Sequence, residues 1–180
     1  MYELTIDQLK QICKNENLKY NYLVDAFNQS CPFFEINTNL RMAMFLAQCI
    51  HETGCFKWVR ELGKPEYFNK YDFRKDLGNV YKGDGGKYKG RGFIQLTGRA
   101  NYEKAGEFLH LPLVEQPELV ESYTIAALVA GWYWKNKNLN YWSDVSDLKK
   151  VTFLINGGYN GLEDRQNWYN ICLEILNCKK

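Results

Sequence analysis

One long run of apolar residues restricts the fold more than any other feature. Residues 40–50 read LRMAMFLAQCI, which is apolar on nearly every side of a helix. A helix that is apolar all round has to be buried inside the protein. Thr38 is placed to cap its start, and Gly54 is placed to end it in a left-handed conformation. The last turn, with His51 and Glu52, is therefore predicted to emerge from the core at a surface.

Further helical patterns lie on both sides of this run. Near the N-terminus an apolar stripe of Ile6, Leu9 and Ile12 accompanies Thr5 and Gln8, which have capping-box spacing. Proline and glycine mark several of the helix ends. Other helices are expected at Leu18–Phe27 before Pro32, at Tyr102–Leu109, at Ser122–Lys135, from a cap at Ser146 to Gly157 and Gly158, and at about Leu162–Leu176.

The stretch from Gly63 to Thr97 has a different character. It contains the glycine-rich sequence GNVYKGDGGKYKGRG, which is followed by the apolar pentapeptide FIQLT at Phe93–Thr97. Glycine clusters predict turns, and the pentapeptide is typical of a short strand. We therefore expect one mainly α domain of 180 residues with a small antiparallel β-element in its middle.

Composition narrows the classes of partner. Aromatic residues make up 16% of the chain, and their rings pack against the apolar faces of sugars as well as in protein cores. The net charge of +2 is too small to favour nucleic-acid binding. Residues 57–99, however, hold eleven Lys/Arg and five Asp/Glu, a local charge of +6 against −4 for the remainder. This basic segment favours an anionic polymer, and bacterial peptidoglycan is one.

The sequence indicates neither a membrane segment nor a disulfide scaffold. No stretch reaches ~18 apolar residues, and the N-terminal MYELTIDQLKQIC lacks the basic start and apolar run of a signal peptide. The six cysteines show no two-residue spacing typical of zinc or redox sites. We therefore expect synthesis in a reducing cytoplasm, free thiols, no stable membrane insertion, and neither a metal nor another cofactor.

Glu52 is the first candidate for acid–base chemistry. Partial desolvation at the end of a buried helix favours the protonated form of a carboxyl group, which a general acid needs. Glycoside hydrolysis usually needs a second carboxylate, about 6.5–9.5 Å away in inverting enzymes. Glu61 is the nearest candidate downstream, and the competitors in the same segment are Glu66, Asp72 and Asp84.

A polar, glycine-rich segment follows, with the sequence GRGFIQLTGRANY at Gly90–Tyr102. Its Gln95, Thr97 and Asn101 offer uncharged groups that suit the acetamido and hydroxyl substituents of a sugar. A hydroxyl group in such a segment can also hold a nucleophilic water. The glycine spacing does not match a phosphate-binding loop, so nucleotide chemistry is not indicated.

Four sequence blocks together resemble one enzyme family. They are HETG at 51–54, REL at 60–62, GDGGKYKGRGFIQLTGRANY at 83–102 and INGGYNGLEDR at 155–165. In this order they resemble glycoside hydrolase family 19, and its compact phage and bacterial endolysins more than its plant chitinases. The resemblance runs from about Thr38 to the C-terminus, and residues 1–37 resemble the helical lead-in of endolysins.

The resemblance implies a lysozyme-like α+β fold, with the β-element beside a catalytic cleft, and inversion at the anomeric carbon. It implies that Glu52 is the general acid, that Glu61 is the base that activates water, and that Thr97 helps to hold that water. Arg165 corresponds to an arginine that supports the acidic pair. Residues that match sugar-binding positions, or positions supporting them, are Gln95, Asn101, Asn156, Tyr88, Tyr102 and His51.

These features predict a monomeric, endolysin-type glycosidase that cuts β-1,4 bonds between N-acetylmuramic acid and N-acetylglucosamine. It would reach the cell wall through a membrane lesion made by another protein. A chitinase is the first alternative, because chitin carries the same acetamido sugar. The others are a non-catalytic glycan-binding relative, a metal enzyme using His51 or His110, and a Cys/His hydrolase built on Cys49 or Cys55.

Overall fold

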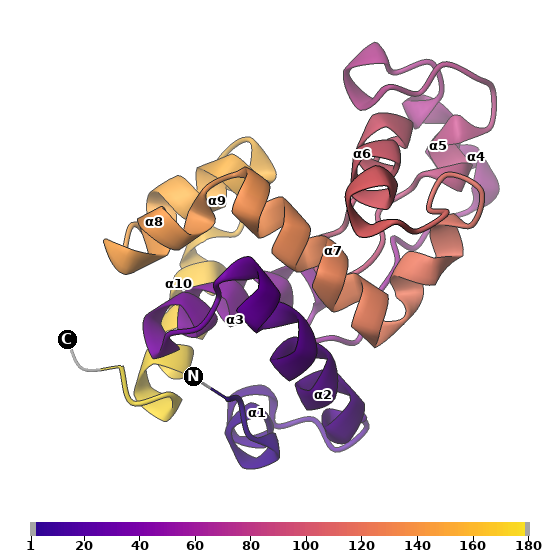
Figure 1. Ribbon diagram of the computed structural model, residues 1–180. Helices are drawn as coiled ribbons and strands as arrows, with labels where there is room; N and C mark the ends of the chain where they lie inside the picture. Colours follow the sequence, from indigo (N-terminus) through magenta and orange to yellow (C-terminus); the bar gives the residue numbers. More distant parts are fainter. Residues whose placement is uncertain (1–2, 179–180) are drawn as a thin grey trace.

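The computed structural model describes residues 3–178, and these are mainly helical (Figure 1). The prediction of a mainly α fold is therefore confirmed. The α-helices are α1 (Ile6–Cys13), α2 (Tyr20–Ser30), α3 (Asn39–Thr53), α4 (Pro65–Phe68), α5 (Asp84–Lys87), α6 (Arg99–Leu109), α7 (Tyr123–Asn136), α8 (Leu139–Asp144), α9 (Leu148–Asn156) and α10 (Leu162–Ile175). Short 3-10 turns are η1 (Cys31–Phe34), η2 (Asn69–Tyr71), η3 (Lys75–Leu77) and η4 (Pro117–Glu121).

Helix α3 is the buried helix that the apolar run predicts. The Thr38 hydroxyl accepts a hydrogen bond from the backbone N–H of Arg41 (3.2 Å), and Gly54 ends the helix with a φ of 56°. Every residue from Met42 to Ile50 is buried. The last turn leaves the core, so Glu52 is only partly buried.

The core forms where α2, α7 and α10 pack around α3. Helix α10 lies along α3, and α7 packs against α2. Phe45 of α3 meets Trp134 of α7 edge-on, with ring centroids 5.0 Å apart. A Cβ at Gly131 would lie 2.1 Å from Cδ2 of Phe34. The close approach of α7 to η1 therefore requires glycine at this position.

The helices fall into two groups on either side of α7 (Figure 1). Helices α3, α8, α9 and α10 lie together on one side, and α4, α5 and α6 lie on the other. The basic segment, residues 57–99, forms most of the second group. This arrangement sets Glu52, at the end of α3, apart from the glycine-rich loops that precede α6.

The predicted β-element is not formed. Within the described residues, the only β-pairing consists of two isolated antiparallel bridges, both involving Arg91. The prediction of a strand at Phe93–Thr97 is wrong, because Gly92 and Gln95 take left-handed backbone angles, with φ of 75° and 52°. The chain therefore turns back on itself here, with the side chain of Phe93 buried.

One further helix prediction needs correction, and three short helices were missed. The helix expected from Ser146 is capped one residue later by Asp147, whose carboxylate accepts a hydrogen bond from the backbone N–H of Lys150 (2.8 Å). Helices α4, α5 and α8 were not predicted, because their four to six residues carry too little periodic pattern.

All six cysteines are free thiols, and four of them are buried. Between residues 3 and 178, no helix has the length and apolar character needed to cross a membrane.

Candidate active site

Glu52 is held by a buried arginine from the far end of the chain. Arg165 of α10 has a side chain only 1% exposed, and its Nη2 donates to Glu52 Oε1 at 2.5 Å. Its Nη1 donates to Gln48 Oε1, also at 2.5 Å. Gln48 precedes Glu52 by about one helical turn, so the planar guanidinium spans both side chains. The Glu52 side chain keeps 17% exposure and stays within reach of a ligand.

The ion pair places a fixed positive charge beside the Glu52 carboxyl group. Arg165 is consequently placed to stabilise the carboxylate that remains once Glu52 has given up a proton.

His51 makes a second contact between α3 and the INGGYNGLEDR block. Its Nδ1 lies 2.6 Å from Oδ2 of Asp164, the residue before Arg165. Gly161 packs directly on the imidazole, because a Cβ there would lie 2.1 Å from His51 Cε1. Its φ of 71° also favours glycine. This block therefore fixes the whole last turn of α3.

Glu61 is held by uncharged donors from the basic segment. Its Oε1 accepts a hydrogen bond from the Tyr71 hydroxyl (3.1 Å), and its Oε2 accepts one from the backbone N–H of Gly90 (3.2 Å). The backbone N–H of Glu61 donates in turn to the Gly90 carbonyl (2.8 Å). These contacts orient the carboxylate without an ion pair in the part of the chain that the structure describes.

Gly90 brings three of the predicted site residues together. A Cβ at Gly90 would lie 2.9 Å from Gln95 Oε1. The same Cβ would lie 3.4 Å from Glu61 Oε2 and 3.4 Å from Thr97 Oγ1. The Thr97 hydroxyl donates to the Gln95 carbonyl (2.9 Å). Three polar side chains thus converge over one backbone position that has no side chain of its own.

The three competing acids are placed differently. Asp84 is 3% exposed and pairs with Arg99 at 2.6 Å. Burial raises the pKa of Asp84, but Arg99 and two backbone N–H groups outweigh it and hold that pKa below its usual value. The Asp72 carboxylate accepts hydrogen bonds from two backbone N–H groups at the start of α5, at 2.9 and 2.8 Å. Glu66 is exposed on α4. Glu61 is therefore the second carboxylate that the fold supports best.

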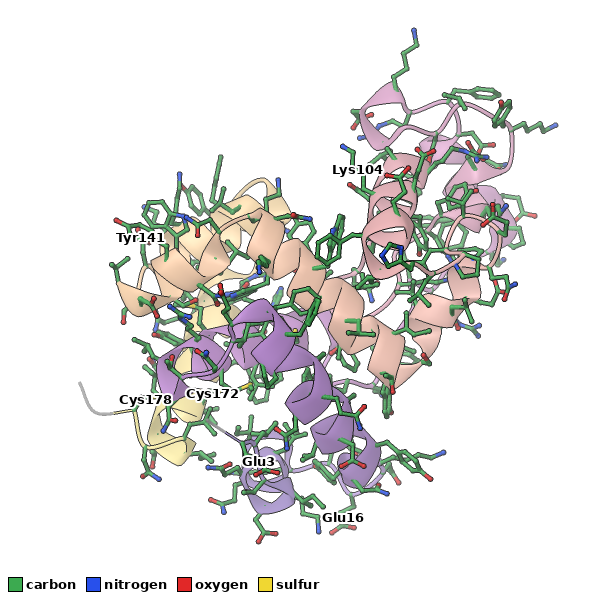
Figure 2. All side chains as sticks on the ribbon, viewed as in Figure 1. Glu3, Glu16, Lys104, Tyr141, Cys172 and Cys178 are labelled. Carbon is green, nitrogen blue, oxygen red and sulfur yellow. The ribbon has the colours of Figure 1, made fainter. Side chains whose placement is uncertain are left out.

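A groove of about 750 Å³ lies between α6 and α7. Figure 2 shows Lys104 on the edge of α6 that faces the other group of helices. A hollow of the same volume lies between α1 and α2, but it is lined by none of the predicted site residues. Side chains that line the groove are Asn101, Lys104, Glu107 and Phe108 of α6, Trp132, Tyr133 and Asn136 of α7, and Lys137, which follows α7.

Contacts on both walls connect this groove to the two acids. On the α7 wall, burial raises the pKa of the Tyr133 hydroxyl, and the negative charge of nearby Glu52 raises it further. On the α6 wall, Asn101 Nδ2 donates to the Thr97 carbonyl at 2.7 Å, and Thr97 lies beside Glu61. The α7 wall is therefore linked to Glu52 through Tyr133 and the α6 wall to Thr97 through Asn101, although neither Glu52 nor Glu61 lines the groove itself.

Tyr88 and Tyr102 lie behind the site rather than in it. Both side chains are 0% exposed, and their ring centroids are 5.4 Å apart. The Tyr88 hydroxyl donates to the Val114 carbonyl (3.1 Å) and the Tyr102 hydroxyl to the Lys89 carbonyl (2.8 Å). Because both side chains are buried, the prediction that they contact the sugar is wrong. The alternative, that they support the residues of the site, remains.

Asn156 is exposed at the C-terminal end of α9. Two residues earlier, the Leu154 carbonyl accepts a hydrogen bond from the Tyr133 hydroxyl (3.2 Å), so this end of α9 lies near the groove. The position suits a sugar contact, and that role stays a prediction.

Sequence reasoning missed three residues that hold the acids, namely Gln48, Tyr71 and Gly90. Gln48 gave a signal as a polar residue inside the apolar run, and its buried Nε2 has no hydrogen-bond partner among the residues described. Tyr71 gave no signal, because nothing marks it among the thirteen tyrosines of the chain. Gly90 stood out only as one of many glycines in its loop.

The metal and thiol alternatives find little support in the donor groups. Residues 3–178 contain no group of three or more His, Cys, Asp or Glu side chains arranged to hold a metal ion. Burial raises the pKa of the Cys49 thiol well above its usual value, which disfavours the reactive thiolate. Cys55 donates to the Cys13 carbonyl (3.7 Å) rather than to a histidine.

Comparison with known proteins identifies the family. The sequence profile of glycoside hydrolase family 19, described as chitinase class I, matches residues 9–147. The match covers most of the chain, which therefore belongs to this family and is a glycoside hydrolase.

Individual relatives agree with this assignment. A glycosyl hydrolase family 19 domain-containing protein of Haemophilus influenzae is 34% identical over 166 residues, covering 77% of this chain and 81% of its own. An endochitinase of Arabidopsis thaliana is 40% identical over 100 residues, which cover 54% of this chain and 33% of that one. The crystal structure of chitinase C from Streptomyces griseus is 26% identical, with a TM-score of 0.76 over 96% of this chain and 92% of that chain.

Proposed function

We propose that this chain is an endolysin-type enzyme that hydrolyses the β-1,4 bond between N-acetylmuramic acid and N-acetylglucosamine in peptidoglycan. The observation that carries the proposal is a pair of partly buried glutamates, Glu52 and Glu61, each held by its own set of partners. The charge of the basic segment favours an anionic wall polymer over neutral chitin. Delivery through a membrane lesion belongs to the same proposal.

In the proposed reaction Glu52 is the acid. Its protonated carboxyl group gives a proton to the glycosidic oxygen as the bond to the anomeric carbon breaks. Arg165 then stabilises the carboxylate left on Glu52, and Gln48 holds the guanidinium in place. This interaction grows as charge develops, so it lowers the barrier rather than merely binding the substrate.

Glu61 is the base in the same step. It accepts a proton from a water that attacks the opposite face of the anomeric carbon. The Thr97 hydroxyl, which lies beside Glu61, is placed to orient that water. One water is consumed, and the products are a new reducing end and a free hydroxyl group. Proton exchange with solvent then returns a proton to Glu52 and removes the proton from Glu61.

A chitinase on the same site is the second candidate. It is favoured by the relatives described as endochitinases and by the likeness to chitinase C. The two polymers share the acetamido sugar and differ in the lactyl ether and its peptide. The groove residues Asn101 and Tyr133 suit either sugar, so the substrate has to be decided by experiment.

Product analysis decides between the two candidates. Purified peptidoglycan and N-acetylglucosamine hexamer are each digested, the new reducing ends are reduced with borohydride, and the products are identified by mass spectrometry. We expect reduced N-acetylmuramic acid at the new ends of peptidoglycan fragments. Cleavage of the hexamer with no fragments from peptidoglycan would contradict the proposal and establish the chitinase.

Replacing Thr97 with alanine is expected to lower kcat by about tenfold, less than the loss of the acid. The hydroxyl orients the attacking water, but Glu61 still accepts its proton and Gln95 still lines the same position. Initial rates on the preferred substrate measure the effect. A loss larger than that of Glu52→Gln would reverse the assigned order of importance.

A further inference from the structure

The lysines and arginines of the basic segment are used differently. All four of its arginines pair with carboxylates: Arg60 and Arg91 with Glu121, Arg74 with Asp76, and Arg99 with Asp84. None of its seven lysines forms an ion pair with any residue that the structure describes. The arginines therefore hold the fold, while the lysine charges remain available to a ligand.

Lys70 is linked to Glu61 indirectly, through the ring of Tyr71. Its Nζ lies 3.5 Å from the ring centroid of Tyr67 and 4.8 Å from that of Tyr71. The Tyr71 hydroxyl donates to Glu61 Oε1 at 3.1 Å. The hydrogen bond to Tyr67 raises the pKa of Lys70, so this side chain stays cationic at neutral pH. A positive charge is thus held one side chain away from the proposed base.

Lys89 is the sequence neighbour of the other residue that binds this carboxylate. It directly precedes Gly90, whose backbone N–H donates to Glu61 Oε2 at 3.2 Å. Its Nζ lies 4.9 Å from the ring centroid of Phe68, and the Phe68 ring packs edge-on against Tyr67 at 5.2 Å. Lys70 and Lys89 therefore rest on one aromatic cluster next to Glu61.

Aromatic faces hold these two cations without neutralising them. A cation over an aromatic ring keeps its full charge and can still bind an anion. Neither ammonium group forms an ion pair with Glu61, whose oxygens accept hydrogen bonds from Tyr71 and from the backbone N–H of Gly90. A neutral sugar polymer has no group that would use two uncompensated cations.

We infer that Lys70 and Lys89 form an anion subsite beside Glu61, which receives carboxylates of the lactyl-peptide substituent of an acidic amino sugar. The inference rests on the proposed function and names the residues that would make this site prefer peptidoglycan to chitin. Exposed lysine–carboxylate contacts are individually weak, so the pair supports a several-fold preference.

The test compares the double variant Lys70→Gln/Lys89→Gln with a matched control, Lys10→Gln/Lys19→Gln. The control removes the same charge from α1 and the start of α2, away from the groove. Values of kcat and KM are measured on soluble peptidoglycan fragments with stem peptides and on N-acetylglucosamine hexamer, at about 20 mM and 200 mM salt. Lys70→Arg/Lys89→Arg tests rescue by charge.

We expect KM for the peptidoglycan fragments to rise about fivefold in the double variant, at least fourfold more than any change on the hexamer. Added salt should raise the wild-type KM on the fragments and have less effect on the variant. The arginine variant and the Lys10/Lys19 control should keep the wild-type preference. Equal losses on both substrates, or no loss on either, would overturn the inference.

Binding separates this inference from the proposed function. Peptide-bearing and peptide-free glycan tetrasaccharides are titrated calorimetrically into Glu52→Gln protein, with and without the two lysine changes. If the wild type cleaves no peptidoglycan, the proposed function fails, and a lysine-dependent preference for the peptide-bearing glycan would still support the subsite. Equal binding of the two glycans would contradict the subsite even in an active peptidoglycan hydrolase.

Discussion

Replacing Glu52 with glutamine is expected to lower kcat by at least about 100-fold. The amide keeps the shape of the side chain and an oxygen that can accept the hydrogen bond from Arg165, but it has no proton to give. Initial rates on peptidoglycan and on N-acetylglucosamine hexamer measure the loss, and glycan binding should persist. Near-normal turnover would refute the role of Glu52 and favour a different acid.

The matched control for this substitution is Glu66→Gln. Glu66 is an exposed glutamate of α4, and its replacement changes the same charge without touching Glu52 or Glu61. We expect its kcat to stay within about twofold of wild type. A large loss from Glu66→Gln would mean that the second carboxylate has been assigned wrongly.

Replacing Arg165 with methionine is expected to lower the free energy of unfolding by about 3 kcal/mol. The change leaves the Glu52 carboxylate and the Gln48 carbonyl oxygen without their shared donor in a largely buried place. For a chain of this size the corresponding fall in Tm is roughly 6–12 °C. Thermal unfolding measures the shift, and kcat should fall with it, since the carboxylate of Glu52 loses its stabilising cation.

Two further variants show whether this effect comes from burial. Arg41→Met breaks an ion pair with Asp144 whose side chains are 22% and 42% exposed, and it should cost less than about 1 kcal/mol. In the double variant Arg165→Met/Glu52→Gln, the loss should be smaller than the sum of the single losses, because no unpaired carboxylate remains. Full additivity would show that Arg165 acts through packing alone.

Much of the framework around Glu52 could be predicted from sequence. The apolar run, the Thr38 cap and the Gly54 stop defined α3 and its exposed last turn, because capping and burial leave local patterns. The GRGFIQLTGRANY block was likewise recognisable as polar and rich in turns. These features are local, so a single sequence displays them.

The partners of the two acids could not be derived in this way. Arg165 meets Glu52 and Gln48 across 113 and 117 residues, and no local pattern encodes such a contact. Tyr71 reaches Glu61 from a 3-10 turn that leaves no periodic signal. The resemblance to known enzymes indicated Arg165, but it did not identify Gln48 or Tyr71.

The strand prediction failed for a related reason. An apolar pentapeptide between glycines has the composition of a short strand, yet a strand needs a partner at the right distance. Here Gly92 and Gln95 both take positive φ angles, and the resulting turn buries Phe93 without a strand. The same turn carries Gln95 towards Glu61, so the irregular backbone is part of the site.

The most direct test of the central claim is the anomeric form of the first product. A proton from Glu52 and a water activated by Glu61 perform a single displacement that inverts the anomeric carbon. Proton NMR on a freshly hydrolysed β-linked substrate should therefore show the α-anomer first, with the β-anomer appearing only as mutarotation proceeds. A product that appears first as the β-anomer would contradict the account, since it would require a covalent or substrate-assisted intermediate in place of the water held beside Glu61.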